Sequence, residues 1–153
     1  MKKIWMKIEE ILAEWKKDSP LNQAKLDEES INTAMLHAKY LEIYSAVKIK
    51  HARMKSKLKA LELDKRRYLK GQMTREEMDD MGWDYDPWKG LARPMKSEMD
   101  DYIKVDPEMA EYGLKMKECE IMIEALHDIM QHIQWRHSHV KNAIDFMRFQ
   151  AGG

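Results

Sequence analysis

The longest stretch of the chain without a helix breaker runs from Gln23 to Lys70 and contains neither glycine nor proline. These residues, about 48 in number, would form a helix roughly 72 Å long, which is far longer than the average helix of a globular protein. A helix of this length gains most of its stability from packing an apolar face along another element. The stretch therefore predicts an all-α protein built on long helices.

Mostly apolar or aromatic residues recur through this stretch at alternating steps of four and three. They define a heptad seam, meaning the stripe of helix positions that faces a packing partner. The seam holds Leu26, Ser30, Thr33, His37, Tyr40, Tyr44, Val47, His51, Met54, Leu58, Leu61, Lys65 and Tyr68. Its polar members interrupt the pattern without changing the period, so we expect a helix over 23–70 that packs along its length.

A second long helix is predicted from Pro107 to Phe149. Asp106, Pro107 and Glu108 form a helix start signal, with a capping residue, a proline at the first helical position and an acid in the first turn. Its seam has no step other than three or four and includes Met109, Tyr112, Met116, Cys119, Ile123, Leu126, Met130, Ile133, His137, Val140, Ile144 and Met147. Two long helices with heptad seams, joined by a loop, predict a helical hairpin that is able to self-associate.

The remaining segments are shorter. Trp5, Ile8, Leu12 and Trp15 are spaced as on a short amphipathic helix within residues 1–18. This helix could dock on the chain's own long helices, or it could contact another protein. Residues 71–94 are rich in Asp, Gly and Pro and are expected to form an acidic loop, and residues 95–150 to form the C-terminal helices. We expect one domain over 1–153.

Composition supports this fold and excludes several classes. Charged residues make up 35% of the chain, mean hydropathy is −0.72, and there are six Gly, four Pro and one Cys. No apolar run approaches the roughly 20 residues that span a bilayer, and Glu9 and Glu10 interrupt any apolar core of a signal peptide. We therefore expect no membrane association, and a single cysteine suits a reducing cytoplasm.

Charge is distributed in blocks although the net charge is zero. Residues 39–75 contain twelve Lys/Arg and three acids, whereas residues 76–111 contain twelve acids and four Lys/Arg. Like charges on one helix face repel, and a nucleic acid would relieve that repulsion by losing its condensed counterions. The alternative is that the basic residues pair with the acidic segment of the same or a neighbouring chain. Both can hold, with the acidic loop competing for a DNA site.

No catalytic or cofactor site is predicted. His127, His132, His137 and His139 are not spaced to place two metal ligands on one helix face, and the chain has no Walker glycine loop and no G-x-S-x-G motif. Cys119 lies on the seam and is most simply a small buried hydrophobe. We expect a non-enzymatic protein without cofactors or metals.

Short sequences at three places carry a resemblance to a known family. They are Ala24-Lys25-Leu26 followed by Asn32, Met35-Leu36 and Lys39-Tyr40-Leu41; then Lys96-Ser97-Glu98-Met99; and finally Val140-Lys141-Asn142-Ala143-Ile144-Asp145-Phe146-Met147-Arg148-Phe149-Gln150-Ala151-Gly152. In this order and spacing the chain resembles the UvsY family, the recombination mediators of T-even-type bacteriophages.

The resemblance implies a ring-shaped homo-oligomer that binds single-stranded DNA in the cytoplasm of the infected host. Such proteins help the phage recombinase, UvsX, replace the phage single-strand-binding protein on that DNA. The family's DNA-binding arginine and lysine, counted back from Tyr68 and Gly71, fall on Lys65 and Leu63. Because Leu63 carries no charge, we expect neighbouring Arg66 and Arg67 to supply it.

Two sets of site residues follow from the charge pattern and the resemblance together. The predicted DNA-binding residues are Lys55, Lys57, Lys59, Lys65, Arg66, Arg67, Tyr68 and Lys70, with Tyr68 as a stacking side chain. The family's C-terminal region is associated with oligomerisation, which assigns that role to Ile123, Leu126, Met130, Ile133, Val140, Ile144 and Met147. The rival hypothesis is a coiled-coil structural adaptor that binds no nucleic acid, and an enzyme is a distant third.

Overall fold

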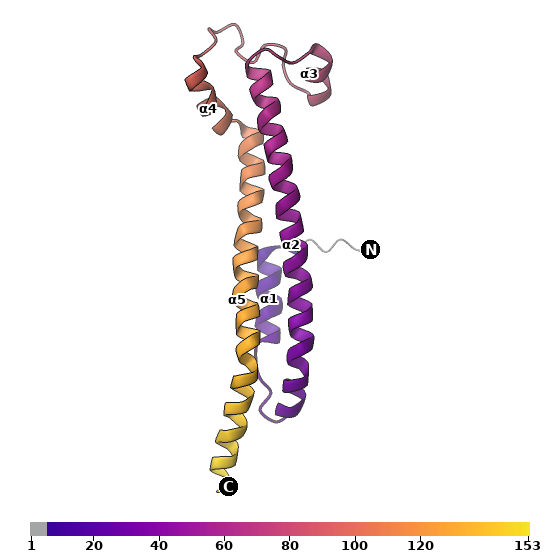
Figure 1. The fold of residues 1–153 in the computed structure, drawn as a ribbon, viewed down its shortest axis with the longest axis vertical. Coiled ribbons are helices and arrows are strands. Elements are labelled where there is room, and N and C mark those ends of the chain that lie inside the picture. Colours follow the sequence, from indigo (N-terminus) through magenta and orange to yellow (C-terminus); the bar gives the residue numbers. More distant parts are fainter. Residues whose placement is uncertain (1–5) are drawn as a thin grey trace. The chain divides into compact units, whose positions relative to one another are not determined.

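The computed structural model describes residues 6–153, which contain five α-helices and no β-strand. In chain order these are α1 (Ile8–Asp18), α2 (Leu26–Leu69), α3 (Arg75–Met81), α4 (Lys96–Lys104) and α5 (Pro107–Gln150) (Figure 1). The two long helices confirm the predicted all-α fold, and Asp106 and Pro107 begin α5 where the start signal indicated. Residues 71–94, expected to be a loop, contain α3. None of the helices in the described part is long and apolar enough to cross a membrane.

Contacts along the chain divide it into two compact units, and both long helices contribute to each. Unit 1 comprises Met1–His51 and Glu118–Gly153, and unit 2 comprises Ala52–Lys117. Unit 1 therefore holds α1, the first half of α2 and most of α5. Unit 2 holds the basic end of α2, all of α3 and α4, and the start of α5.

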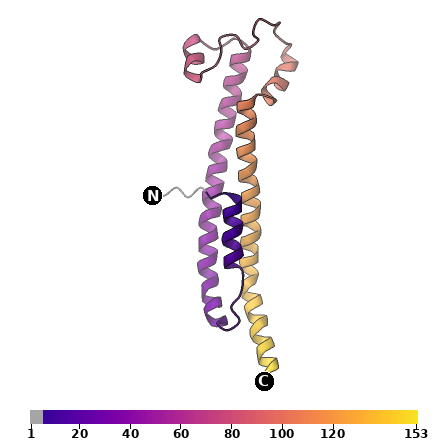
Figure 2. The ribbon, with the colours of Figure 1, turned by 180° about the vertical axis from the view of Figure 1, so that it is seen from behind.

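Unit 1 is a three-helix arrangement around one apolar core. In both views α1 lies against α2 and α5 (Figures 1 and 2). The most deeply buried core side chains, none more than 1% exposed, are Ile11, Tyr40, Cys119, Leu126 and Ile133, and Val47, Met122 and Ile129 complete the cluster. A side chain of this kind that is removed from water contributes roughly 1.5–3 kcal/mol, so this cluster dominates the stability of unit 1.

The N-terminal helix docks on the chain's own long helices. Ile8 and Trp15 pack against the core around buried Ile11, and the Trp15 and Tyr40 rings meet edge to face with centroids 5.5 Å apart. Leu12, which was expected on this stripe, is exposed, because the buried face follows Ile8, Ile11 and Trp15 instead. Trp5, the other tryptophan of the predicted stripe, lies outside the described residues.

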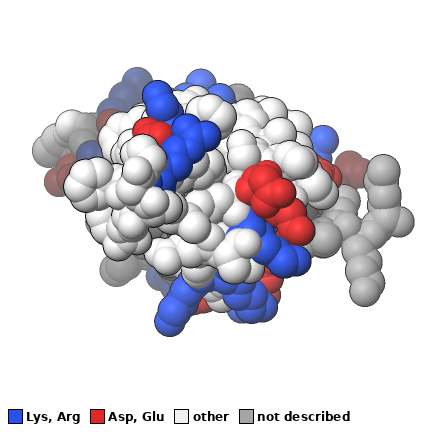
Figure 3. Space-filling model, turned by 90° about the horizontal axis from the view of Figure 1, so that it is seen from below, with Lys and Arg blue, Asp and Glu red and all other residues white. Residues whose placement is uncertain are grey.

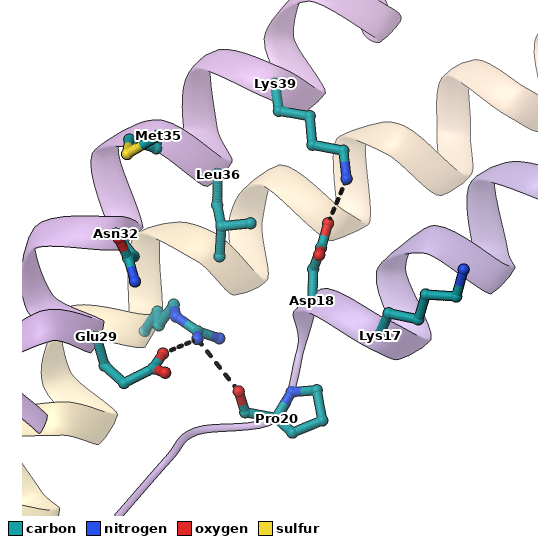
Figure 4. Close-up of a pocket in the computed structure, with 9 residues that line it drawn as sticks. Lys17, Asp18, Pro20, Glu29, Asn32, Met35, Leu36 and Lys39 are labelled. Carbon is teal, nitrogen blue, oxygen red and sulfur yellow. Dashed lines mark hydrogen bonds and ion pairs between the residues drawn. The ribbon is translucent and has the colours of Figure 1, made fainter. Parts of the chain in front are cut away.

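A buried arginine holds the connection between α1 and α2 onto α5. The guanidinium of Arg136 donates to the carbonyl oxygens of Ser19 (2.9 Å) and Pro20 (3.3 Å), and it also pairs with the carboxylate of Glu29. Glu29 and Pro20 line a pocket together with Arg136, and Figure 4 shows them with Asp18 and Lys39, which pair with each other at the same pocket. Arg136 is only 5% exposed, so its charge depends on these partners.

The heptad seam of α2 is confirmed, whereas that of α5 needs two corrections. Every seam position predicted between Leu26 and Tyr68 is buried or half-buried. In α5, the predicted seam residues His137 and Met147 are exposed, and Arg136, the neighbour of His137, is buried instead. Met122 and Ile129, which lie off the predicted seam, are buried because α1 packs as a third helix and requires a wider apolar face on α5.

In unit 2, α2 ends at a glycine that reverses the chain. Gly71 has φ +71°, a left-handed conformation that suits a residue without a Cβ. Its amide donates to the Tyr68 carbonyl, and the Gln72 amide donates to the Arg67 carbonyl. A Cβ on Gly71 would lie 2.7 Å from the Arg93 guanidinium. The turn thus connects the last basic residues of α2 with the acidic segment that follows.

Candidate nucleic-acid interface

The basic end of α2 presents a stripe of cations along one helix face. Lys55, Lys59, Arg66 and Lys70 follow one another at steps of four, seven and four, which keep side chains on one face of a helix. We call these four residues the cationic stripe. The three lysines are exposed, and none of their ammonium groups has an ion pair or hydrogen bond with another described residue. Their charges are therefore available to an external anion.

Lys65 occupies a different environment on the seam face of the same helix. It is only 7% exposed, and its ammonium lies 3.2 Å from the Asp106 carboxylate and 3.1 Å from the Glu108 carboxylate. The ammonium also lies 4.0 Å from the centre of the Trp83 ring, where the negative face of the aromatic system attracts a cation. Three partners surround this charge, so Lys65 contributes to the packing of unit 2 in this structure.

The two arginines that follow are paired with acids of the segment predicted to compete with DNA. Arg66 donates to Glu62 at 2.9 Å and to Asp100 of α4 at 2.5 Å. Arg67 donates to Glu77 of α3 at 2.8 Å. Hydrogen bonds to Glu62 and then to Asp100 raise the pKa of the Arg66 guanidinium. The hydrogen bond to Glu77 raises the pKa of the Arg67 guanidinium in the same way. The internal pairing foreseen as an alternative thus occurs within one chain for these residues.

Two of the carboxylates that pair with cations of α2, Glu77 and Asp106, also cap helices. Glu77 accepts from the Thr74 amide at 2.8 Å while the Thr74 hydroxyl accepts from the Glu77 amide, which forms a capping box at the start of α3. The Thr74 backbone hydrogen bond, followed by that from Arg67, lowers the pKa of Glu77. Asp106 accepts from the Glu108 and Met109 amides at 3.1 Å and so caps α5. The ion pairs are therefore connected to the local fold of unit 2.

Tyr68 is half-buried and packs beside the Lys65 cluster. Its ring centroid lies 5.0 Å from that of Trp83, and its hydroxyl donates to the Asp84 carbonyl at 2.7 Å. Burial first, and then the charges of Asp84, Asp86 and Asp106, raise the pKa of Tyr68, so the phenol stays neutral and donates. Trp83 is in turn held by Glu108, which accepts from its indole N–H at 3.2 Å.

The structure thus divides the predicted DNA-binding residues into three groups. Lys55, Lys59 and Lys70 are exposed on the cationic stripe, and Arg66 is on the stripe but paired. Lys57 is exposed at a position that does not share the spacing of the stripe. Lys65, Arg67 and Tyr68 lie among the acids and aromatics of unit 2. Trp83 and Glu108 were not predicted as partners of Lys65, although the seam position of Lys65 indicated a packed side chain.

The predicted oligomerisation residues also separate by exposure. Leu126, Ile133 and Val140 are buried within the chain, and Ile123 and Met130 pack against the core of unit 1. Their assignment to oligomerisation stays a prediction, although these five side chains are buried or packed within the chain itself. Ile144 is half-buried and Met147 is half exposed.

Large apolar side chains that the prediction did not include are exposed on α5: Trp135, Phe146 and Phe149. Figure 3 shows the end of the molecule at which α5 finishes. Much of this surface is uncharged, and small groups of opposite charge lie beside one another. Phe146 and Phe149 leave apolar surface uncovered near the end of α5.

Comparison with known proteins relates this fold to one class. Two crystal structures of the bacteriophage T4 recombination mediator protein UvsY match with a TM-score of 0.77 each, at 21% and 24% identity. They cover 95% of this chain and 99% and 98% of their own chains. The recombination protein uvsY of Enterobacteria phage T4 is 27% identical over 148 residues, which cover 96% of this chain and 99% of the relative. The fold is thus that of a phage recombination mediator.

The family assignment rests on a match over most of the chain. The model of the family described as "Recombination, repair and ssDNA binding protein UvsY" matches residues 14–153. The chain therefore belongs to the UvsY family. Within the described residues 6–153, no group of His, Cys, Asp and Glu side chains is arranged to hold a metal ion.

Proposed function

We propose that this protein is a recombination mediator that binds single-stranded DNA through the cationic stripe and promotes loading of a phage recombinase onto DNA coated with single-strand-binding protein. The observation that carries the proposal is the set of three exposed, unpaired lysines, Lys55, Lys59 and Lys70, on one face of α2 in a member of the UvsY family. It acts without catalysis or a cofactor, in the cytoplasm of the infected bacterial host.

Phosphates would bind this surface in two stages. The stripe lysines can bind phosphates first, because no carboxylate of a described residue forms an ion pair with them. Arg66 and Arg67 bind a phosphate only by exchanging it for Asp100 and Glu77, their present partners. Both pairs are partly exposed, and exposed pairs are weak, about 0–1 kcal/mol each, so a polyanion with many phosphates can displace them.

Self-association would raise the affinity for a DNA strand, because weak contacts from several subunits act together. Several copies of the stripe in a ring-shaped homo-oligomer engage one strand together, and each further contact is intramolecular. We assign the subunit contact to the exposed apolar residues near the end of α5, Phe146, Met147 and Phe149, with half-buried Ile144 beside them. These side chains resemble the apolar core of an interface rather than a solvated surface.

A salt titration with a labelled oligonucleotide tests the proposal. The affinity of the wild-type protein should fall steeply with salt, and a Lys55→Ala/Lys59→Ala/Lys70→Ala variant should show a slope of log affinity against log salt that is shallower by about 2 per subunit, at about 0.7 per lost phosphate contact. The control is Lys16→Ala/Lys141→Ala, which removes exposed lysines of unit 1.

The rival adaptor hypothesis makes the opposite prediction. A structural coiled-coil protein whose cations serve only internal pairs would bind no oligonucleotide even at low salt, and that outcome would contradict the proposal. A fall in slope per removed lysine that is equal in the unit 1 control would also contradict it, since any loss of positive charge would then have the same effect.

A further inference from the structure

A cavity of about 420 Å³ opens in unit 2 beside the end of the cationic stripe. It is lined by the last turns of α2, by the loop after α3 and by α4, and it continues to the start of α5. Tyr68 and Leu69 line it and immediately precede Lys70 of the stripe. A volume of this size is in the range of small-ligand sites, about 300–1,000 Å³.

Aromatic side chains form part of the cavity wall. Trp88 and Tyr102 meet edge to face, with ring centroids 5.1 Å apart and planes at 86°, and both line the cavity together with Tyr68. The Tyr102 side chain is about half exposed, at 49%. An aromatic surface that remains open beside a cationic stripe is what an unstacked nucleobase requires, because each base has a π face that can stack.

Two polar groups at this wall have no partner among the described residues. The indole N–H of Trp88 is buried and makes no hydrogen bond, and the Tyr102 hydroxyl makes none. A buried donor without an acceptor is uncommon in folded proteins. The edge of a base carries carbonyl and ring-nitrogen acceptors, which are the kind of partner that such donors lack.

The charges at the cavity favour a nucleotide over an apolar side chain. Lys65, Lys89 and Asp106 line it with the aromatics, and Lys89 is exposed with a left-handed backbone (φ +50°) that is uncommon for a residue other than glycine. Lys65 and Asp106 already pair with each other, so Lys89 is an exposed charge at this wall that a phosphate can match. An apolar group from a partner would leave Lys89 unmatched.

We propose that this cavity holds one unstacked base of a single strand whose phosphates follow the cationic stripe. The proposal rests on the proposed function and adds to it a reason for preferring single strands. A base in a duplex is stacked and paired, and inserting it would require its removal from the stack. The phosphates alone do not make that distinction.

The test compares two oligonucleotides of equal length, oligo-dT and an abasic strand with the same number of phosphates. Tyr102→Leu removes the π face while retaining an apolar side chain, and it should lower the affinity for oligo-dT by roughly tenfold without affecting the abasic strand. Trp88→Leu should act in the same direction, and Trp88→Phe should restore part of the binding of oligo-dT, because it returns a π face without the N–H donor. The matched control is Tyr85→Leu, an exposed aromatic of unit 2 that does not line the cavity.

The outcomes separate the two proposals. If Tyr102→Leu lowers the affinity for both strands equally, or leaves oligo-dT binding unchanged, the cavity does not hold a base and this inference is overturned. If the wild-type protein binds neither strand at low salt, the proposed function fails instead. A salt slope for oligo-dT that is unchanged in Tyr102→Leu supports a contact to the base rather than to a phosphate.

Discussion

The two compact units of this chain are stabilised by different means. Unit 1 has a continuous apolar core in which Ile11, Tyr40, Leu126 and Ile133 are almost wholly excluded from water. Unit 2 has fewer buried apolar side chains, and a buried lysine lies among them, held by two carboxylates and a tryptophan. The contrast indicates that unit 1 provides most of the folding energy, whereas unit 2 keeps charge close to its surface.

The helix α2 passes through both units and shows the same contrast along its length. In unit 1, Lys39 is held by Glu14 at 2.9 Å and Asp18 at 2.7 Å, so its charge is used within the fold. In unit 2, Lys55, Lys59 and Lys70 have no such partners. One helix therefore pairs a lysine within the fold in unit 1 and leaves lysines exposed in unit 2.

The largest effect should come from breaking the buried pair in unit 1. Arg136→Ala leaves the Glu29 carboxylate without its partner and the carbonyls of Ser19 and Pro20 without a donor. We expect the free energy of unfolding to fall by about 3–5 kcal/mol, measured by urea unfolding. The affinity of the remaining folded protein for DNA should not change, because the stripe lies in unit 2.

Arg148→Ala is the matched control, since this arginine is exposed on the same helix and should change stability by no more than about 0.5 kcal/mol. A loss below about 1 kcal/mol for Arg136→Ala would contradict the role assigned to the buried pair. So would a specific loss of DNA binding without a loss of stability.

A smaller effect, a gain in affinity for DNA, is expected when the acids that pair with the arginines of unit 2 are neutralised. Glu77→Gln can retain the capping box of α3 while releasing Arg67, and Asp100→Asn releases Arg66 from α4. Each should raise the affinity for single-stranded DNA several-fold and steepen the salt slope by about 0.7, as expected for one further phosphate contact.

The neighbouring acids provide controls of equal charge. Glu76→Gln and Asp101→Asn also remove one negative charge, but neither residue holds a described cation. If they raise the affinity as much as Glu77→Gln and Asp100→Asn, the effect is one of net charge alone. If none of the four raises it, the ion pairs are structural and do not compete with DNA.

The smallest effect concerns the acid stability of unit 1. Burial alone would raise the pKa of Asp18, but hydrogen bonds from Lys39 and Tyr40 outweigh it and hold the pKa below its ordinary value. A depressed carboxylate pKa contributes stability above the unfolded pKa of 3.8 and loses it as pH falls through the folded value. The unfolding free energy should therefore be flat at neutral pH and decline below about pH 4.

Lys39→Met should lower the unfolding free energy near neutral pH by up to about 1 kcal/mol and flatten this decline, because the pair is partly exposed. Lys16→Met, at an exposed position of α1, is the comparison and should leave the pH profile unchanged. If the unfolding free energy declines identically at low pH in wild type and Lys39→Met, the pKa of Asp18 does not depend on Lys39.

Much of the fold could be predicted from the sequence because long helices leave strong local signals. The absence of Gly and Pro from 23 to 70 and the Asp106-Pro107 start gave boundaries close to those of α2 and α5. The heptad seam of α2 predicted its buried face in both units. The third helix was harder to place, since the position of α1 depends on contacts between distant residues, and these also bury Arg136, Met122 and Ile129.

The site was less predictable, for a reason that Lys65 illustrates. Its seam position indicated packing, whereas the family resemblance pointed to DNA, and a charge count cannot decide between the two. Burial of a lysine depends on whether carboxylates and an aromatic face arrive from far along the chain, as Asp106, Glu108 and Trp83 do. The spacing of Lys55, Lys59, Arg66 and Lys70 was visible in the sequence, but their pairing was not.

The division of labour between the units can be tested by lysine footprinting. Amine-reactive labelling of the wild-type protein, with and without oligo-dT, measures the protection of each lysine by mass spectrometry. We expect strong protection of Lys55, Lys59 and Lys70, weaker protection of Lys57, and none of Lys16 or Lys141 in unit 1. Uniform protection of all six lysines, or protection confined to unit 1, would show that DNA does not bind along the cationic stripe.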